Sequence, residues 1–315
     1  MYLICGEALF DLFGENSSGD SVAFDARIGG SPFNVAMGLA RLGEDAGFFG
    51  GISRDALGER LVQKFRSEGV SERYILRTDY LTTLSLVQKD DQGSPAYTFY
   101  GANAADRMVT EEDLPDFDTP PAYLHIGSYT ALVEPVSKAL KALIAREKHH
   151  TLISFDPNIR PTVVPDMGLW RQNTEALVPL TDLIKVSDED LELIAPGEPV
   201  EQIARKWLGA GAGLVIVTRG GDGATAFAPG IEVDCPGIKV TVEDTVGAGD
   251  TFQAALLAGL RQLGVTDRTA LDRLEEDALR RLVGFAVKAA AITCSRRGAD
   301  LPRRAELEKE WAALN

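Results

Sequence analysis

Cysteine is scarce in this sequence, and its placement excludes a disulfide framework or a zinc site. Cys5, Cys235 and Cys294 lie far apart, their number is odd, and no Cys-x-x-Cys pair occurs. We therefore expect reduced thiols in or near the core, as is usual in the cytoplasm. A chain of 315 residues buries about three-quarters of its unfolded surface and folds without a covalent or metal staple.

Positive charge is scarce as well. The chain has 32 Lys and Arg against 47 Asp and Glu, which gives a net charge of −15 at neutral pH. A surface of this sign repels phosphate backbones and anionic lipids, so nucleic acids and membranes are not expected partners. An anionic small molecule would have to be bound locally, by backbone amides, a few placed cations or a metal ion.

Long apolar runs and a leader peptide are both absent. No apolar segment approaches the roughly 18 residues of a membrane-spanning helix. The N-terminus lacks a basic segment and turns acidic at Glu7 and Asp11, which is unlike a signal peptide. We expect a cytoplasmic protein, and the 45% apolar and 25% charged fractions are ordinary for a globular chain.

Short apolar runs alternate with amphipathic helical patterns through most of the chain. Runs at 123–126, 152–155, 183–186 and 214–217 are bounded by Gly, Pro or Asp, as expected of strands buried on both faces of a parallel sheet. The alternation predicts an α/β fold with a mostly parallel central sheet flanked by helices.

Two stretches depart from this alternation. Residues 81–101 have the pattern of a hairpin with a turn at 90–94, and residues 13–28 are polar and Gly-rich with a short strand at 22–24. We predict that 13–28 and 81–101 form a small β-sheet lid. Residues 1–12, 29–80 and 102–315 would then form the large domain.

Polar residues collect where the predicted strands end. In open parallel sheets, ligands bind just beyond the carboxyl ends of the strands. The sequence therefore predicts a polar small-molecule site along this edge. The residues at these ends are Asp11, Gly127 and Ser128, Asp156, Asn158 and Arg160, Ser187 to Asp190, and Thr218 to Gly223.

The strongest local signal is the segment 244–252, which precedes an apolar helix. Small residues at Gly247, Ala248 and Gly249 leave first-turn amides uncovered, and such amides bind anions with the help of the helix dipole. Asp250 is then well placed to take a proton from a nucleophile near that anion. An Asp in a first turn often only complements the helix dipole, but the flanking small residues and Asp244 favour the functional interpretation.

Other phosphate-binding motifs match poorly. The sequence has no GxxxxGK[ST], and the loose GxGxxA match at 221–226 leads into a hairpin-like segment rather than a helix. A second glycine cluster spans 29–36, where Ser31 can cap a helix and Pro32 suits its first position. Its glycine pair permits close backbone approach to a ligand, and the amide of Asn34 suits a sugar hydroxyl.

Together these residues resemble the ribokinase-type (PfkB) carbohydrate kinases. The segment 244–250 matches the C-terminal signature of that family, 29–36 matches its N-terminal signature, and the strand-end motifs follow in order, so the resemblance covers essentially the whole chain. It implies a ribokinase-like fold and ATP-dependent phosphorylation of a sugar hydroxyl. Asp250 would be the catalytic base, and the amides of Gly247, Ala248 and Gly249 would stabilise charge on the transferring phosphoryl group.

The same resemblance assigns the remaining roles. Mg²⁺ would arrive with ATP, and the groups around Asp244 would hold a monovalent cation such as K⁺. The family commonly has an Asn-x-x-Glu motif where this chain has Ser187 to Asp190, so Asp190 keeps the carboxylate that would serve Mg²⁺. Segment 290–298 would lie near the adenine. The sugar would be bound by Asp11, Gly29, Gly30, Asn34, Phe99, Arg107 and Arg160. The nucleotide would be bound by Lys185, Ser187, Thr218, Arg219, Gly220, Gly223, Gly247 and Gly249.

The sugar itself is harder to predict. The segments 29–34, 99–100 and 156–161 look most like bacterial fructokinases. The 2-keto-3-deoxygluconate kinases of the family often have an arginine where this chain has Gly101, although Arg107 could serve a ketoacid instead. A nicotinamide-dependent dehydrogenase using 221–226 and a non-catalytic sugar-binding regulator remain as alternatives. A homodimer through the exposed strand edges of the lid is also expected.

Overall fold

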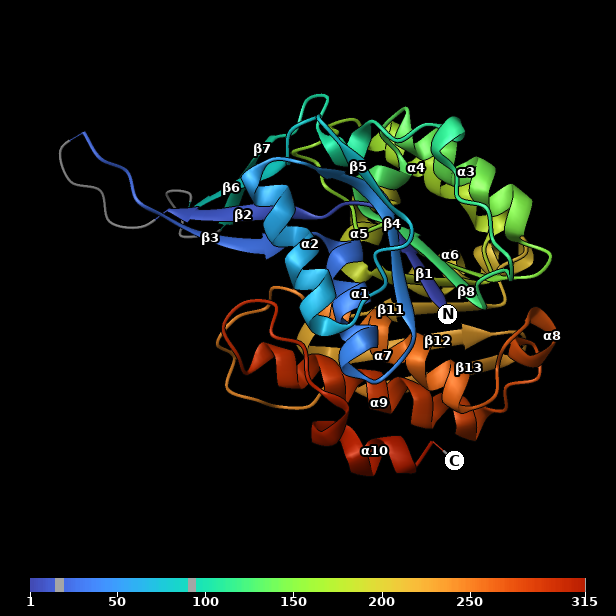
Figure 1. Cartoon of the computed structure of the whole chain (residues 1–315). Coiled ribbons are helices and arrows are strands. Elements are labelled where there is room, and N and C mark those ends of the chain that lie inside the picture. Colours follow the sequence, from blue (N-terminus) through green and yellow to red (C-terminus); the bar gives the residue numbers. More distant parts are fainter. Residues whose placement is uncertain (15–19, 90–94, 315) are drawn as a thin grey trace.

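The structure is a computed structural model that describes residues 1–14, 20–89 and 95–314 (Figure 1). Most of the chain builds one large sheet with helices on both faces, and the rest adds a small second sheet. The strands of the large sheet are β1 (Tyr2–Cys5), β4 (Ala46–Ser53), β5 (Ile75–Thr78), β8 (Tyr123–Gly127), β9 (Leu152–Asp156), β10 (Leu183–Ser187), β11 (Leu214–Thr218), β12 (Gly223–Ala228) and β13 (Ile231–Pro236).

The large sheet has the order β13-β12-β11-β10-β9-β8-β1-β4-β5. The seven strands that lie between the β5 edge and β11 in this order, both included, pair in parallel, and β12 and β13 continue the sheet in antiparallel fashion. The four apolar runs predicted from the sequence are β8, β9, β10 and β11, so the predicted parallel core is confirmed. All their carboxyl ends therefore meet at one edge, which is where a ligand site is expected.

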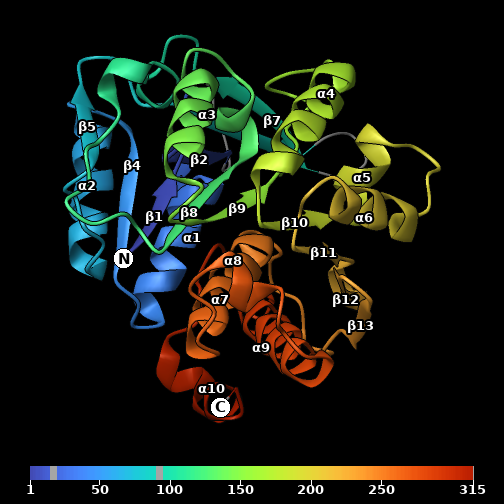
Figure 2. The same ribbon diagram turned by 90° about the vertical axis from the view of Figure 1, so that its right-hand side faces the viewer.

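Two helix layers cover the sheet (Figure 2). Side chains of β1 alternate between them: Ile4 packs in the core under α1, α7 and α9, whereas Leu3 and Cys5 pack in the core under α3. Both sets are fully buried, which explains the near-continuous apolar runs. The helices are α1 (Ser31–Arg41), α2 (Ala56–Glu68), α3 (Val136–Glu147), α4 (Met167–Leu177), α5 (Asp188–Ile194), α6 (Val200–Gly209), α7 (Ala248–Gln262), α8 (Arg268–Leu271), α9 (Glu276–Cys294) and α10 (Glu308–Ala312).

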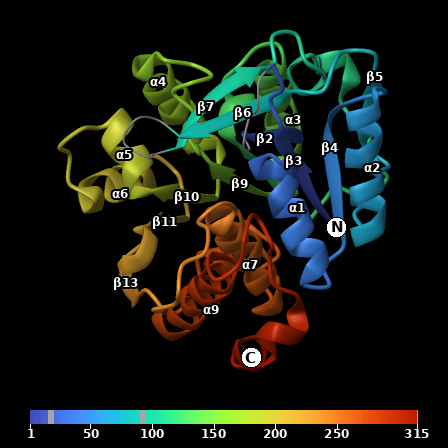
Figure 3. The same ribbon diagram turned by 90° about the vertical axis from the view of Figure 1, so that its left-hand side faces the viewer.

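The small sheet projects from the large domain (Figures 1 and 3). It has the order β3-β2-β6-β7, with β2 and β6 parallel and the outer pairs antiparallel. The hairpin predicted within 81–101 is present as β6 and β7, and its expected turn at 90–94 lies outside the described residues. The strands are β2 (Leu9–Gly14), β3 (Phe24–Gly29), β6 (Leu84–Lys89) and β7 (Pro95–Tyr100).

The border between the two sheets differs from the expected one. The small sheet begins at Leu9, so residues 9–12, assigned above to the large domain, belong to the small sheet. Its second strand begins at Phe24 and not at Val22. The reason is that Leu9 and Phe10 are still buried and apolar, so the change in polarity comes after the change of sheet.

No helix in the described part of the chain combines the length and apolarity that crossing a membrane requires.

Candidate active site

The first turn of α7 forms the floor of the site. Gly247 precedes the helix with φ 78°, and a Cβ there would lie 2.6 Å from the Cβ of Ala299, so only glycine fits. The Ala248 amide donates to the Thr245 carbonyl at 3.2 Å, so one of the three predicted anion-binding amides is already paired. Within the described residues, the amides of Gly247 and Gly249 have no protein acceptor and are ready for an anion.

Asp250 lies in this turn and is held by α1. Its two carboxylate oxygens accept hydrogen bonds from Ser31 Oγ at 2.6 Å and from Asn34 Nδ2 at 2.8 Å. Gly30 precedes α1 with φ 107°, and a Cβ there would lie 2.8 Å from the Glu7 carbonyl oxygen. Ser31 was expected to cap α1, but Gly30 is the capping residue and the Ser31 hydroxyl serves Asp250 instead.

A buried lysine lies beneath the same turn. Lys185 Nζ donates to Asp156 Oδ2 at 2.7 Å, and a Cβ on Gly249 would lie 3.0 Å from this nitrogen. Burial raises the pKa of Asp250, while the hydrogen bonds from α1 and the charge of Lys185 lower it. Lys185, predicted to bind nucleotide, thus lies against both the anion-binding turn and the catalytic candidate.

The Asp11 side chain of β2 lies against Gly29 of β3, which is the strand partner of Leu9. A Cβ on Gly29 would lie 2.2 Å from Asp11 Oδ2, so this glycine makes room for the carboxylate. Burial, with a smaller contribution from the charge of Asp250, raises the pKa of Asp11 to about 6, against the lowering effects of the nearby Ser85 hydroxyl and the charge of Arg160. These interactions bring the predicted sugar residues of β2 and the loop after β9 to the same site as Asp250.

Two of the predicted sugar-binding residues, one aromatic and one cationic, lie together around the ring of Tyr129. The Phe99 ring meets the Tyr129 ring edge-on at 5.9 Å, and the Arg107 guanidinium lies 4.9 Å from the centre of the Tyr129 ring. Arg107 Nε and Nη2 are buried without a hydrogen-bond partner among the described residues, so they are available to a ligand. Nη2 would lie 2.7 Å from a Cβ on Gly101.

Sequence reasoning missed two residues here. Tyr129 orients Arg107 and donates to Asp106 Oδ2 at 2.8 Å. Glu7 is buried, accepts from Thr130 Oγ1 at 3.0 Å, and has its pKa raised by burial to about 7. Both follow strand ends, Glu7 after β1 and Tyr129 after β8, so a stricter use of the strand-end rule would have found them.

The residues at the Asn-x-x-Glu position are engaged in local structure. Ser187 caps α5 by accepting the Asp190 amide at 3.0 Å, and Asp190 Oδ1 accepts the Ile159 amide at 3.0 Å. Burial and the charge of Asp156 raise the pKa of Asp190. The described residues contain no group of three or more His, Cys, Asp or Glu arranged for a metal ion, so the Mg²⁺ role of Asp190 stays a prediction.

Asp244 is likewise fully engaged. Its oxygens accept the amides of Val246 at 3.1 Å and Gly298 at 2.8 Å, which ties the loop before α7 to the loop after α9. The monovalent-cation role predicted for Asp244 stays a prediction.

The predicted nucleotide residues after β11 are two side chains that already have hydrogen-bond partners and two glycines that differ in the space around them. Arg219 donates to Asp234 Oδ1 at 2.6 Å and to the Thr225 hydroxyl, so it is bound to the β12–β13 hairpin. Thr218 Oγ1 donates to a carbonyl of β10 at 3.4 Å. A Cβ on Gly220 would meet no atom within 4 Å, whereas Gly223, at φ 99°, would place a Cβ 2.1 Å from the Cys235 carbonyl oxygen.

The segment 221–226 does not form a dinucleotide-binding turn. It runs directly into β12, which pairs antiparallel with β11, and no helix N-terminus follows. This removes the structural basis of the dehydrogenase alternative.

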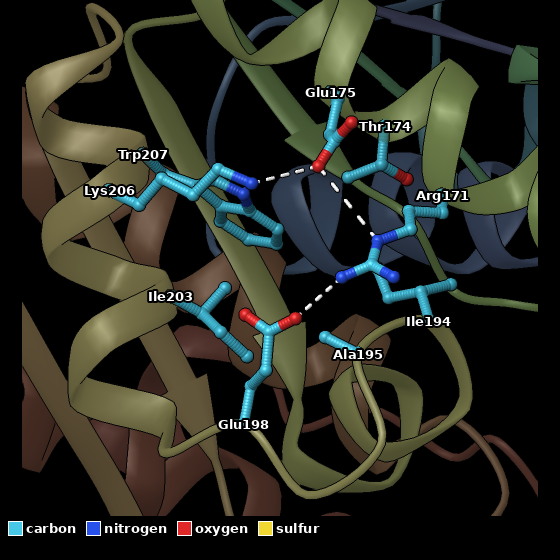
Figure 4. Close-up of a pocket in the computed structure, with 9 residues that line it drawn as sticks. All are labelled: Arg171, Thr174, Glu175, Ile194, Ala195, Glu198, Ile203, Lys206 and Trp207. Carbon is cyan, nitrogen blue, oxygen red and sulfur yellow. Dashed lines mark hydrogen bonds and ion pairs between the residues drawn. The ribbon is translucent and has the colours of Figure 1, made fainter.

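A separate surface pocket lies between α4, α5 and α6 (Figure 4). Ion pairs cross it, from Arg171 to Glu198 at 2.5 Å and from Lys206 to Glu175 at 2.9 Å. None of the predicted site residues lines this pocket, so it is not part of the candidate site.

Known proteins resemble this chain in sequence and fold over nearly its whole length. Residues 3–306 match the pfkB family of carbohydrate kinases. A fructokinase of Rhizobium leguminosarum bv. trifolii is 36% identical over 280 residues, which cover 89% of this chain and 86% of the relative. The crystal structure of a Xylella fastidiosa fructokinase with bound ATP superposes with a TM-score of 0.89 at 26% identity, covering 99% and 98% of the two chains. A Vibrio cholerae O395 fructokinase with fructose, ADP and calcium gives 0.83 at 27% identity and 98% coverage of each chain. The chain therefore belongs to the pfkB family of carbohydrate kinases.

Proposed function

We propose that this carbohydrate kinase is a fructokinase that transfers the γ-phosphoryl group of ATP to a hydroxyl of fructose. The observation that carries the proposal is the position of Asp250, in the first turn of α7 beside the free amides of Gly247 and Gly249 and held by Ser31 and Asn34. A base and an anion-binding turn at one place are what phosphoryl transfer to a hydroxyl requires.

On the phosphate side, the α7 amides and helix dipole stabilise the negative charge of the transferring group. Mg²⁺ bound with ATP supplies further neutralisation of the phosphates, and Asp190 is the carboxylate that would serve it, through the oxygen that does not hold Ile159. The open space at Gly220 suits the nucleotide. We keep K⁺ near Asp244 as part of the proposal.

On the sugar side, Asp11 and Asn34 hold hydroxyl groups, and Gly29 and Gly30 let the backbone approach them. Arg107 and Arg160 supply donors, and Phe99 packs against the ring of the sugar. Asp250 then takes the proton of the attacking hydroxyl as the hydroxyl oxygen bonds to the γ-phosphorus, while the bond from that phosphorus to the bridging oxygen breaks and ADP leaves with the bonding electron pair. The rate enhancement comes from positioning and charge neutralisation and not from covalent chemistry by the protein.

A 2-keto-3-deoxygluconate kinase is the second candidate. The buried, unpartnered Nε and Nη2 of Arg107 could bind a substrate carboxylate. However, Asp106 Oδ2 lies 4.0 Å from Arg107 Nε, and this neighbour offsets the charge that a carboxylate would need. Fructose, which carries no charge, suits the pair better.

We further propose that the small sheet closes over the sugar and joins two copies of the chain. Its outer strands β3 and β7 are open edges, and Phe24 and Tyr100 on them are 42% and 61% exposed. Light scattering on the purified protein should give the mass of a dimer, and a Phe24→Glu variant should give that of a monomer. The three unpaired cysteines suit a cytoplasmic enzyme.

A coupled ATP-consumption assay tests the function. The panel compares fructose with 2-keto-3-deoxygluconate, ribose, tagatose and nucleosides at saturating MgATP. Fructose should give the highest kcat/KM. A higher value for the ketoacid would establish the second candidate, and tight NADH binding without ATP binding would contradict both.

A further inference from the structure

Three ionisable side chains meet beneath the first turn of α7, and only one of them is basic. Lys185 Nζ is bonded to Asp156 Oδ2 at 2.7 Å, and both side chains are almost fully buried. The charge of the same ammonium also acts on Asp250, because it lies directly under Gly249. One cation therefore faces two carboxylates from the end of β10.

The pairing within this group is selective. The short bond from Lys185 goes to Asp156, at the end of the neighbouring strand β9, while Asp250 receives its hydrogen bonds from Ser31 and Asn34. Asp156 Oδ1 is buried without a hydrogen-bond partner in the described residues. A carboxylate that served only the fold would be expected to satisfy both oxygens.

We propose that the buried Lys185–Asp156 pair is a positioning device for the catalytic carboxylate: Asp156 anchors the ammonium beneath Gly249, where it acts on Asp250 without binding it. This inference rests on the proposed kinase function and concerns how its base is kept ready.

The physical reason lies in what a base needs. A carboxylate bonded directly to an ammonium has an occupied lone pair and a depressed pKa, so it is a weaker base. A carboxylate buried with no cation nearby is pushed toward its protonated form, which cannot accept a proton at all. An ammonium that is held near the carboxylate by another group, without bonding to the carboxylate itself, keeps the carboxylate pKa between these two extremes.

Other charged groups surround this centre. Asp11 of β2 acts on Asp250, and Asp190 of α5 acts on Lys185. Arg160, from the loop after β9, acts on Asp11 and Asp190. On β8, burial and the charge of Lys185 lower the pKa of His125 to about 3, so that ring stays neutral. Ser31 and Asn34 of α1 are uncharged.

Three variants test the device through the pH dependence of kcat/KM for the sugar. Lys185→Met should move the acid limb to higher pH by about one to two units, because Asp250 loses a nearby cation. Asp156→Asn should move it to lower pH by about one unit, because the released ammonium binds Asp250. Lys206→Met, at an exposed ion pair with Glu175, is the matched control and should leave the limb in place.

The nucleotide titrates identically in every variant, so differences between profiles report on the protein. Limbs that coincide with the wild type in both Lys185→Met and Asp156→Asn, whatever the loss in rate, would overturn the proposal. If Lys185→Met turns over too slowly for a pH profile, or unfolds at a low temperature, then Asp156→Asn alone decides: an acid limb that coincides with that of the wild type overturns the proposal.

Carboxyl titration by ¹³C NMR, with Asp250 assigned from an Asp250→Asn spectrum, gives a readout independent of turnover. Opposite displacements of the Asp250 titration in Lys185→Met and Asp156→Asn support the proposal, and an unmoved titration overturns it. A wild-type protein that phosphorylates no sugar would refute the proposed function while leaving this measurement decisive for the charge arrangement.

Discussion

The proposed phosphate side and the proposed sugar side of this site are built in different ways. On the phosphate side, Gly247, Ala248, Gly249 and Asp250 are consecutive residues at the start of α7. On the sugar side, Asp11, Asn34, Phe99, Arg107 and Arg160 come from five separate segments, two of them in the small sheet. One half is a property of a single helix end, and the other exists only once both sheets are in place.

The difference separates chemistry from recognition. A helix N-terminus binds an anion through amides that any sequence of small residues supplies, so the phosphate side can be the same for many sugars. The sugar side depends on side chains whose spacing is set by the lid. Variants on the two sides should therefore differ in whether they lower kcat or raise the sugar KM.

The largest effect is expected on the phosphate side, from Asp250→Asn. Loss of the base should lower kcat by about a thousandfold or more in the ATP-consumption assay, with the melting temperature unchanged or raised because a buried charge is removed. Asp277→Asn, the same change at an exposed position in the first turn of α9, is the control. Near-normal turnover by Asp250→Asn would end the assignment of this residue as base.

Gly249→Ala should come next. Its methyl would lie 3.0 Å from Lys185 Nζ and would partly cover the anion-binding turn, so kcat should fall by about ten- to a hundredfold. Gly284→Ala in α9 meets nothing within 4 Å and should raise the melting temperature without changing kcat. Equal kcat in the two variants would show that the turn does not hold the phosphoryl group.

Asp11→Asn should act on the sugar side. An ionised acceptor is lost, so the sugar KM should rise by about tenfold or more with a smaller change in kcat. Because the pKa of Asp11 is raised to about 6, the wild-type KM should increase as the pH falls below that value, when the carboxylate becomes protonated. The variant should lack this dependence, and a parallel rise of KM in both proteins would contradict the role.

The smallest effect is expected from Arg219→Met. Its guanidinium is held by Asp234 and Thr225, so it contributes to the hairpin more than to the nucleotide. The ATP KM should change by less than about threefold, since an exposed ion pair is worth little. A tenfold rise in the ATP KM would return Arg219 to the nucleotide site.

The same division explains what the sequence could predict. Strands β8 to β11, helix α7 and its anion-binding turn depend on neighbouring residues, and periodicity and small-residue spacing revealed them. The bond from Ser31 to Asp250 joins residues 219 positions apart, and no local pattern encodes it. Lys185 was identified as a binding residue, but its burial against Asp156 emerges only when β9 and β10 pair.

The predicted border of the lid was wrong for a related reason. Polarity marks where a strand leaves the core, not where it changes sheet, and Leu9 and Phe10 remain buried after the chain has left the large sheet. Tyr129 was missed because aromatic residues after a strand are usually part of the core, and its role depends on the arrival of Phe99 from the lid and of Arg107 from the segment that follows the lid.

Gly29 has a consequence for how such a site can change over generations. A side chain at position 29 would occupy the space of the Asp11 carboxylate, with its Cβ 2.2 Å from Oδ2. A lineage can therefore lose Asp11 first and fill position 29 afterwards, but the reverse order would displace the carboxylate at once. The glycine thus makes the loss of the Asp11 carboxylate easy to complete and hard to undo.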